Sequence, residues 1–153
     1  MPLGSDVILV VPRGVAVAAV LVVDDDADHC ELISKVLTRQ GHHVACALNG
    51  WEALLVLDSS NVDLIILDLM MPGMDGATFL GIMRNDKRRK HIPVIAVTAL
   101  AEGPLASRVR ALDVKKVFRK AEYELSELVE SVHQNLCPPE QRAGDSGDSA
   151  PMN

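Results

Sequence analysis

Acidic, hydroxyl and basic side chains stand at the ends of four short apolar runs in this sequence. Three consecutive aspartates, Asp24 to Asp26, follow the first run, and Asp68 follows a second. Thr98 ends a third run, and Lys120 comes two residues after a fourth. Grouped carboxylates repel one another, by about 1 kcal/mol for a pair about 4 Å apart in water. A fold tolerates them when a hard dication lies between their oxygens, so we predict a Mg²⁺ site here.

The same residues suit phosphoryl chemistry. A carboxylate that is ionised at neutral pH can attack phosphorus and form an aspartyl phosphate without a general base. Lys120 and the metal would neutralise charge on the transferring oxygens, and the Thr98 hydroxyl can hold one of them. Zinc is disfavoured because no histidine or cysteine stands at these run ends.

These residues become neighbours only if the apolar runs form one sheet. From Val20 to Leu136, short apolar runs alternate with segments of helical period. The expected strands are Val20–Val23, His43–Ala47, Leu64–Leu67, Val94–Val97 and Val117–Phe118. The expected helices contain Cys30–Leu37, Asn49–Leu57, Phe79–Met83, Leu105–Leu112 and Leu125–Leu136. Five strand–helix repeats predict an α/β fold with a parallel sheet, helices on both faces and a site beyond the carboxyl ends of the strands.

The sequence pattern also predicts burial and capping. The side chains expected to face the core from the second helix are Trp51, Leu54 and either Leu55 or Leu57. The thiols expected in the core are those of Cys30 and Cys46. The histidines expected at the surface or in loops are His29, His42 and His43. Asp26 is expected to cap the first helix, since aspartate suits a helix N-terminus.

Composition indicates one domain in a reducing, cytoplasmic setting. The 153 residues suffice for one core, and the formal net charge of −6 argues against a direct nucleic-acid partner. The three cysteines, which include Cys137, form no CxxC motif and indicate neither a disulfide framework nor a zinc site. The apolar stretch Val7–Val23 is interrupted at Pro12 and is too short for a membrane span.

The two ends of the chain differ from its middle. Residues 1–19 are interpreted as an N-terminal extension of uncertain origin, either native, a targeting segment or the remnant of a protease site. Residues 137–153 are rich in Pro, Gly, Ser and Asp, so we predict a disordered tail. The domain is therefore expected at residues 20–136, without an output domain after it.

Four segments together resemble the receiver domain of bacterial response regulators. They are Val22–Asp26, Leu64–Gly76, Pro93–Ala99 and Val117–Lys120. The second, LIILDLMMPGMDG, is the most specific, and the order of all four supports the resemblance. It implies a flavodoxin-like sheet with strand order 2-1-3-4-5, and a signalling domain of two-component systems rather than an enzyme.

The resemblance also implies a role for each matching residue. Asp68 would accept the phosphoryl group from a histidine kinase or a histidine phosphotransfer protein and so switch the binding of a downstream protein. Mg²⁺, with Mn²⁺ as the alternative ion, would be held by Asp25, Asp68 and the backbone carbonyl of Met70, with Asp24 acting through water. The groups that would bind the phosphoryl oxygens are Thr98, Lys120 and the backbone of Ala99.

Several positions depart from the family pattern or are expected to affect the lifetime of the phosphoryl group. Ala121 replaces the usual proline after Lys120, so a cis bond there would cost about 2.5–4 kcal/mol, and the alternative is a trans loop. Thr98 and Val117 occupy the switch positions, but Val117 replaces an aromatic residue, and the adjacent Phe118 should face the other side of its strand. Two apolar residues, Met70 and Leu100, stand where the family places the path of the hydrolytic water, which predicts a long-lived phosphoryl group.

Two other functions remain open on the sequence. One is a pseudo-receiver, a protein-binding module that keeps the fold without phosphorylation, which the Val117 and Ala121 departures favour. The other is a phosphatase of the haloacid-dehalogenase type, because Asp24 and Asp26 match the start of its motif. Asp28 stands where that motif needs threonine or valine, and the chain is short for the remaining motifs.

Overall fold

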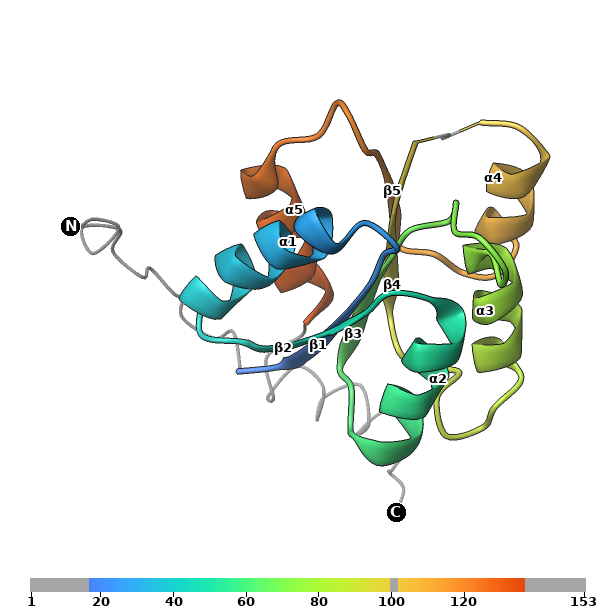
Figure 1. The fold of residues 1–153 in the computed structure, drawn as a ribbon, viewed down its shortest axis with the longest axis horizontal. Helices are drawn as coiled ribbons and strands as arrows, with labels where there is room; N and C mark the ends of the chain where they lie inside the picture. Colours follow the sequence, from blue (N-terminus) through green and yellow to red (C-terminus); the bar gives the residue numbers. More distant parts are fainter. Residues whose placement is uncertain (1–16, 100–101, 137–153) are drawn as a thin grey trace, which may run out of the picture.

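The computed structural model describes residues 17–99 and 102–136 as five strands and five helices in alternation (Figure 1). The strands are β1 (Ala19–Val23), β2 (His43–Ala47), β3 (Leu64–Leu67), β4 (Val94–Thr98) and β5 (Lys116–Arg119). The helices are α1 (Ala27–Arg39), α2 (Gly50–Ser59), α3 (Gly76–Arg84), α4 (Pro104–Arg110) and α5 (Leu125–Asn135). All strand pairs are parallel, in the order β2-β1-β3-β4-β5, which confirms the predicted fold class.

The sheet separates two apolar layers. Figure 1 shows α1 and α5 on one face and α2, α3 and α4 on the other. Successive residues of β1 alternate between the layers, because Val20 and Val22 pack with α1 and α5 while Leu21 and Val23 pack toward α2 and α3. Burying such a side chain stabilises the fold by about 1.5–3 kcal/mol, so the two layers fix the register that places the strand ends together.

Helix α2 buries Leu57 and packs Leu54 against the core, as predicted, but it does not bury Trp51. Trp51 is 65% exposed and Leu55 is also exposed, whereas the buried residues are Gly50, Ala53 and Leu57. The physical reason is space: a Cβ atom at Gly50 would lie 2.5 Å from the sulfur of Met74. Only small side chains fit this contact, so the large residues one position along the helix turn outward and the prediction for Trp51 was wrong.

Two further burial predictions were wrong. Cys30 is buried as expected, but Cys46 is exposed, because β2 is the edge strand of the sheet and most of its residues remain accessible. His42 was expected at the surface and is only 3% exposed. Its Nδ1 accepts a hydrogen bond from the backbone N–H of Ala18, and its Nε2 lies 3.1 Å from Nε2 of His133.

The chain ends are only partly covered by the described residues. Of the extension predicted at residues 1–19, Ala19 belongs to β1, and residues 1–16 lie outside the described part. The tail predicted at residues 137–153 also lies outside it. In the described part of the chain, no helix has the length and apolar character that crossing a membrane requires.

Candidate metal centre

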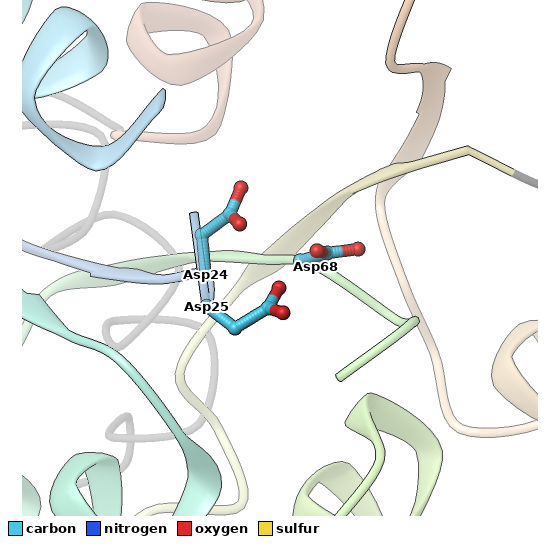
Figure 2. Close-up of side chains that lie close together, drawn as sticks. All are labelled: Asp24, Asp25 and Asp68. Atoms are coloured by element: carbon cyan, nitrogen blue, oxygen red, sulfur yellow. The ribbon is translucent and has the colours of Figure 1, made fainter. Parts of the chain in front are cut away.

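Three carboxylates meet at the carboxyl ends of β1 and β3. Ligand oxygens of Asp24, Asp25 and Asp68 all lie within 4.8 Å of one another, and Figure 2 shows the three side chains pointing into one space. The sheet register explains the meeting, since Val23 pairs with Leu67 and the N–H of Asp68 donates to the carbonyl of Val23 at 2.8 Å. The predicted convergence of these aspartates is therefore confirmed.

The three aspartates differ in exposure. Asp24 and Asp68 are 2% and 3% exposed, whereas Asp25 is exposed. Asp26 stays out of the group, because its carboxylate caps α1 by accepting from the N–H groups of Asp28 and His29. The capping prediction is confirmed, and the capping role removes the second aspartate that a haloacid-dehalogenase site would need.

Lys120 provides the ammonium group of this site. Its Nζ lies 3.1 Å from Asp24 Oδ1 and 3.2 Å from Asp68 Oδ2. Its backbone N–H donates to the carbonyl of Thr98 at 2.7 Å, which ties the loop after β5 to the end of β4. All peptide bonds between described residues are trans, so Lys120 reaches the carboxylates without a cis bond before Ala121.

The remaining predicted site residues lie around this group or outside the described part. Thr98 is buried at the end of β4, and Ala99 follows it with an exposed side chain. The N–H of Met70 donates to Asp68 Oδ1 at 3.0 Å, and its side chain is exposed. Val117 packs in the layer of α2 to α4, while Phe118 packs in the layer of α1 and α5, as predicted for strand neighbours. Leu100 lies outside the described residues.

The surroundings separate the acidities of the two buried carboxyl groups. Burial alone would raise the pKa of Asp24, but hydrogen bonds from His29, the N–H of Asp26 and Lys120 outweigh it and lower that pKa. Burial raises the pKa of Asp68 to about 6; the nearby Asp24 adds to the rise, while the N–H of Met70 and Lys120 oppose it. Burial would lower the pKa of Lys120, yet the two aspartates raise it above its usual value.

Two residues that the sequence did not indicate hold Asp24 in place. His29 Nδ1 lies 2.5 Å from Asp24 Oδ2, and His29 Nε2 lies 2.7 Å from the hydroxyl of Tyr123. The cap at Asp26 offered a signal for His29, because it places the first turn of α1 directly beside the end of β1. Tyr123 is 94 residues from His29, so no local pattern could have found it.

The donor set fits a hard dication. When all three carboxylates are ionised, three negative charges face the single ammonium of Lys120 and leave a net charge of −2. Mg²⁺ prefers such oxygen ligands, and the described residues hold no other group of three His, Cys, Asp or Glu side chains close enough to share an ion. A phosphoryl oxygen beside Lys120 and Thr98 would complete a site for phosphoryl transfer.

Comparison with known proteins gives consistent findings. The family model for the response regulator receiver domain matches residues 20–133. Response regulator PleD of Caulobacter vibrioides is 41% identical over 83 residues, which cover 54% of this chain and 18% of PleD. Transcriptional regulatory protein AfsQ1 of Streptomyces coelicolor is 36% identical over 121 residues, which cover 68% of this chain and 52% of AfsQ1. The chain thus spans about half or less of the length of these curated relatives.

Solved structures share the fold over the whole of the compared domain. Response regulator TrrA from Thermotoga maritima, in complex with Mg²⁺-BeF, has a TM-score of 0.68 and 34% identity, and the match covers 78% of this chain and 99% of TrrA. Chemotaxis protein CheY4 of Vibrio cholerae has a TM-score of 0.73 and 27% identity, and the match covers 79% of this chain and 100% of CheY4.

Proposed function

This chain belongs to the response regulator receiver domain family, and from that premise we propose that it accepts a phosphoryl group on Asp68 with Mg²⁺ bound beside it. The observation that supports the proposal is the convergence of Asp24, Asp25 and Asp68 within 4.8 Å, with Lys120 in contact with two of them. The repulsion between these like charges lowers the stability of the folded protein, and a bound dication would offset it. The same dication would then help to bind a phosphoryl group.

The donor groups available to Mg²⁺ are the carboxylates of Asp25 and Asp68 and the backbone carbonyl of Met70, with Asp24 acting through water. When bound, the ion offsets negative charge on the transferring phosphoryl group. The solved TrrA complex holds Mg²⁺-BeF, which supports the same use of this site here, and Mn²⁺ fits the same oxygen ligands.

Asp68 is the nucleophile in this proposal. Its Oδ1 accepts the N–H of Met70, and its Oδ2 lies beside Lys120, so the carboxylate is held at both oxygens. A pKa of about 6 leaves most of the group ionised at neutral pH. After transfer, the Lys120 ammonium, the Thr98 hydroxyl and the backbone N–H of Ala99 would bind the phosphoryl oxygens.

The biological setting is the finer part of the proposal. A phosphohistidine of a histidine kinase or phosphotransfer protein would supply the phosphoryl group, and a downstream protein would read the phosphorylated state. Thr98 and Val117 would connect the two events. The domain would act in the cytoplasm as a signalling domain rather than an enzyme, without binding nucleic acid or membrane itself.

Intact-protein mass spectrometry tests the proposal. We expect the full chain, incubated with Mg²⁺ and acetyl phosphate, to gain the mass of one phosphoryl group, and Asp68→Asn to gain none. Asp26→Asn is the matched control, because asparagine caps a helix as well as aspartate and the change removes one nearby charge. Wild-type protein that stays unmodified with Mg²⁺ present, or an Asp68→Asn variant that is still labelled, would falsify the proposal.

The pseudo-receiver is the second candidate. The observation in its favour is Val117, whose small side chain packs in the core where the family usually has an aromatic residue. A binding module of this kind would remain unlabelled by acetyl phosphate although it folds normally, so the same experiment separates the two functions.

Met70 and Leu100 concern the lifetime of the phosphoryl group. Because both side chains are apolar, they cannot orient a hydrolytic water, and we propose slow loss of the phosphoryl group. The double variant Met70→Asn with Leu100→Glu should change the dephosphorylation rate, measured after removal of acetyl phosphate. An unchanged rate would contradict this part of the proposal.

A further inference from the structure

Two cysteine side chains meet between α1 and β2, next to the main chain of Asp24. The Sγ atom of Cys30 lies 3.5 Å from the carbonyl oxygen of Asp24 and 3.8 Å from that of Val22. The Sγ atom of Cys46 lies 3.6 Å from the carbonyl oxygen of Cys30. Val22 and Cys46 are partners in the sheet register, and Val22 packs in the layer of α1, so the side chain of Cys46 lies on the face of the sheet that α1 and Cys30 cover.

The two thiols have unequal access to solvent. Cys30 is 2% exposed on the inner face of α1, whereas Cys46 is exposed on the edge strand. A hydrogen bond from the Cys30 thiol lowers the pKa of Cys46 to about 7, although burial opposes this shift. The sulfur of Cys46 is therefore the one that a peroxide in solution can reach, and the buried thiol of Cys30 lies behind it.

We propose that Cys30 and Cys46 are a redox pair that closes a reversible intramolecular disulfide on exposure to hydrogen peroxide. The Cys46 thiolate attacks one peroxide oxygen, the O–O bond breaks, and hydroxide leaves and takes a proton to become water. Cys46 is then a sulfenic acid. The Cys30 sulfur attacks the Cys46 sulfur, the S–O bond breaks, and the released hydroxide leaves as water with the Cys30 proton. Two thiols are oxidised by two electrons, and one peroxide is reduced to two waters.

The disulfide would act on the neighbouring site. It would tie α1 to β2, and it would draw the Cys30 sulfur away from the carbonyl of Asp24. His29 of α1 contacts the Asp24 carboxylate, so a shift of this helix would move a carboxylate of the site. This consequence rests on the proposed function, and we expect the oxidised protein to accept phosphoryl groups more slowly than the reduced protein.

The disulfide itself is tested without reference to phosphorylation. In the full chain with Cys137→Ser, which leaves only this pair, hydrogen peroxide should remove the mass of two hydrogen atoms, and dithiothreitol should restore it. Peptide mapping should find Cys30 joined to Cys46 in a monomer. A Cys46→Ser variant should not react, because Cys30 is buried, whereas Cys30→Ala should gain one oxygen at Cys46 that dimedone traps. Circular dichroism confirms that each variant is folded.

Three outcomes would overturn the redox pair. They are a folded protein that gains oxygen at Cys46 without cross-linking, disulfides between two chains, or no reaction with peroxide. The consequence for the site is judged separately, by acetyl phosphate labelling of reduced and oxidised protein. Equal labelling rates would overturn the effect on Asp68 while leaving the disulfide in place. If reduced protein is not labelled at all, the proposed function fails and the redox pair stands.

Discussion

The two ends of the parallel sheet treat buried polar groups in opposite ways. At the carboxyl end, Asp24 and Asp68 are buried beside the charge of Asp25, and Lys120 lies between the two buried groups. At the amino end, the buried polar side chains among the described residues are His42 and Arg89, and each has a matching partner. We infer from this difference that the polar groups of the amino end stabilise the fold, whereas those of the carboxyl end suit the binding of a ligand.

Arg84 illustrates the amino end. Its guanidinium donates to four backbone carbonyls in two connections that are far apart in sequence. The acceptors are the carbonyls of Lys90, Ile92, Leu112 and Asp113, at 2.7 to 3.1 Å. These carbonyls precede β4 and β5, so one side chain on α3 fixes the starts of both strands. A donor with five N–H groups in a rigid plane suits this arrangement.

At the carboxyl end, by contrast, the negative charges of the buried carboxylates are only partly compensated. The raised pKa of Asp68 means that ionising this carboxyl group costs free energy in the folded protein. A dication that binds there returns this free energy, because it favours the charged form of the group. The comparison therefore predicts that changes at the amino end reduce stability, while removal of charge at the carboxyl end raises it.

The largest effect is expected for Arg84→Ala. The change leaves the part-buried carbonyls of Ile92 and Leu112 without this donor, whereas those of Lys90 and Asp113 are exposed to water. An unsatisfied buried acceptor costs about 1–3 kcal/mol, so we expect a loss of about 3 kcal/mol from these two carbonyls and the lost packing of the side chain. Urea unfolding followed by circular dichroism measures it. Arg88→Ala is the control, since Arg88 is exposed and contacts Asp58 and Asp86 at the surface, where ion pairs contribute about 0–1 kcal/mol. Equal losses in the two variants would contradict the role of Arg84.

The next effect has the opposite sign. Asp68 has a pKa of about 6 in the folded protein, above its value of about 3.9 in an unfolded chain. Between these values the folded state binds more protons, so wild-type stability falls as pH rises from about 4 to 6. Asp68→Asn removes the charge, and in EDTA at pH 7.5 we expect it to be more stable than wild type by about 2 kcal/mol.

Mg²⁺ should reverse this order. The ion binds the folded wild type and stabilises it by mass action, while the variant lacks one ligand and gains less. Urea unfolding of both proteins, with EDTA and with saturating Mg²⁺, gives the comparison, and Asp26→Asn again controls for loss of a charge. If Asp68→Asn unfolds at lower urea than wild type in EDTA, the claim that the ionised Asp68 carboxylate destabilises the folded protein is wrong.

The fold was predictable because its determinants are local. Apolar runs such as Leu64–Leu67 identify buried strands, and the 3.6-residue period identifies α1 and α5. Asp24 and Asp68 followed from the same reasoning, since parallel strands end at one edge. Residues adjacent to strand ends thus reveal a site without any knowledge of contacts.

The missed features depend on contacts between distant residues. His29 with Tyr123 and His42 with His133 are separated by 94 and 91 residues, and either histidine alone resembles a surface residue. Cys46 was misplaced because a strand's own sequence does not tell whether it lies at the sheet edge. Trp51 was misplaced because the fit of Gly50 against Met74, rather than hydrophobicity, decides which face of α2 is buried.

The histidine pair at the amino end should give the smallest effect and the opposite pH dependence. His42 Nδ1 accepts from the N–H of Ala18, so its Nε2 holds the proton and donates to Nε2 of His133. Protonation of the acceptor nitrogen His42 Nδ1 breaks the hydrogen bond from Ala18, and protonation of His133 Nε2 breaks the hydrogen bond between the two rings. Burial lowers the pKa of both rings, and for His42 the neighbouring His133 and His43 add to the effect. Stability supplied by the pair is present above about pH 6.5 and is lost as pH falls.

A variant without the pair should therefore lose stability at pH 7.5 but little at pH 5. We expect His133→Gln to cost about 1 kcal/mol at the higher pH, the net contribution of one hydrogen bond, when measured by urea unfolding in the Asp68→Asn background. In that background, the opposite pH dependence of stability that Asp68 contributes is absent. His91→Gln, at an exposed position, is the control. A His133→Gln deficit that is as large at pH 5 as at pH 7.5 would show that the ring stabilises by packing alone, because only the paired neutral imidazoles depend on the proton.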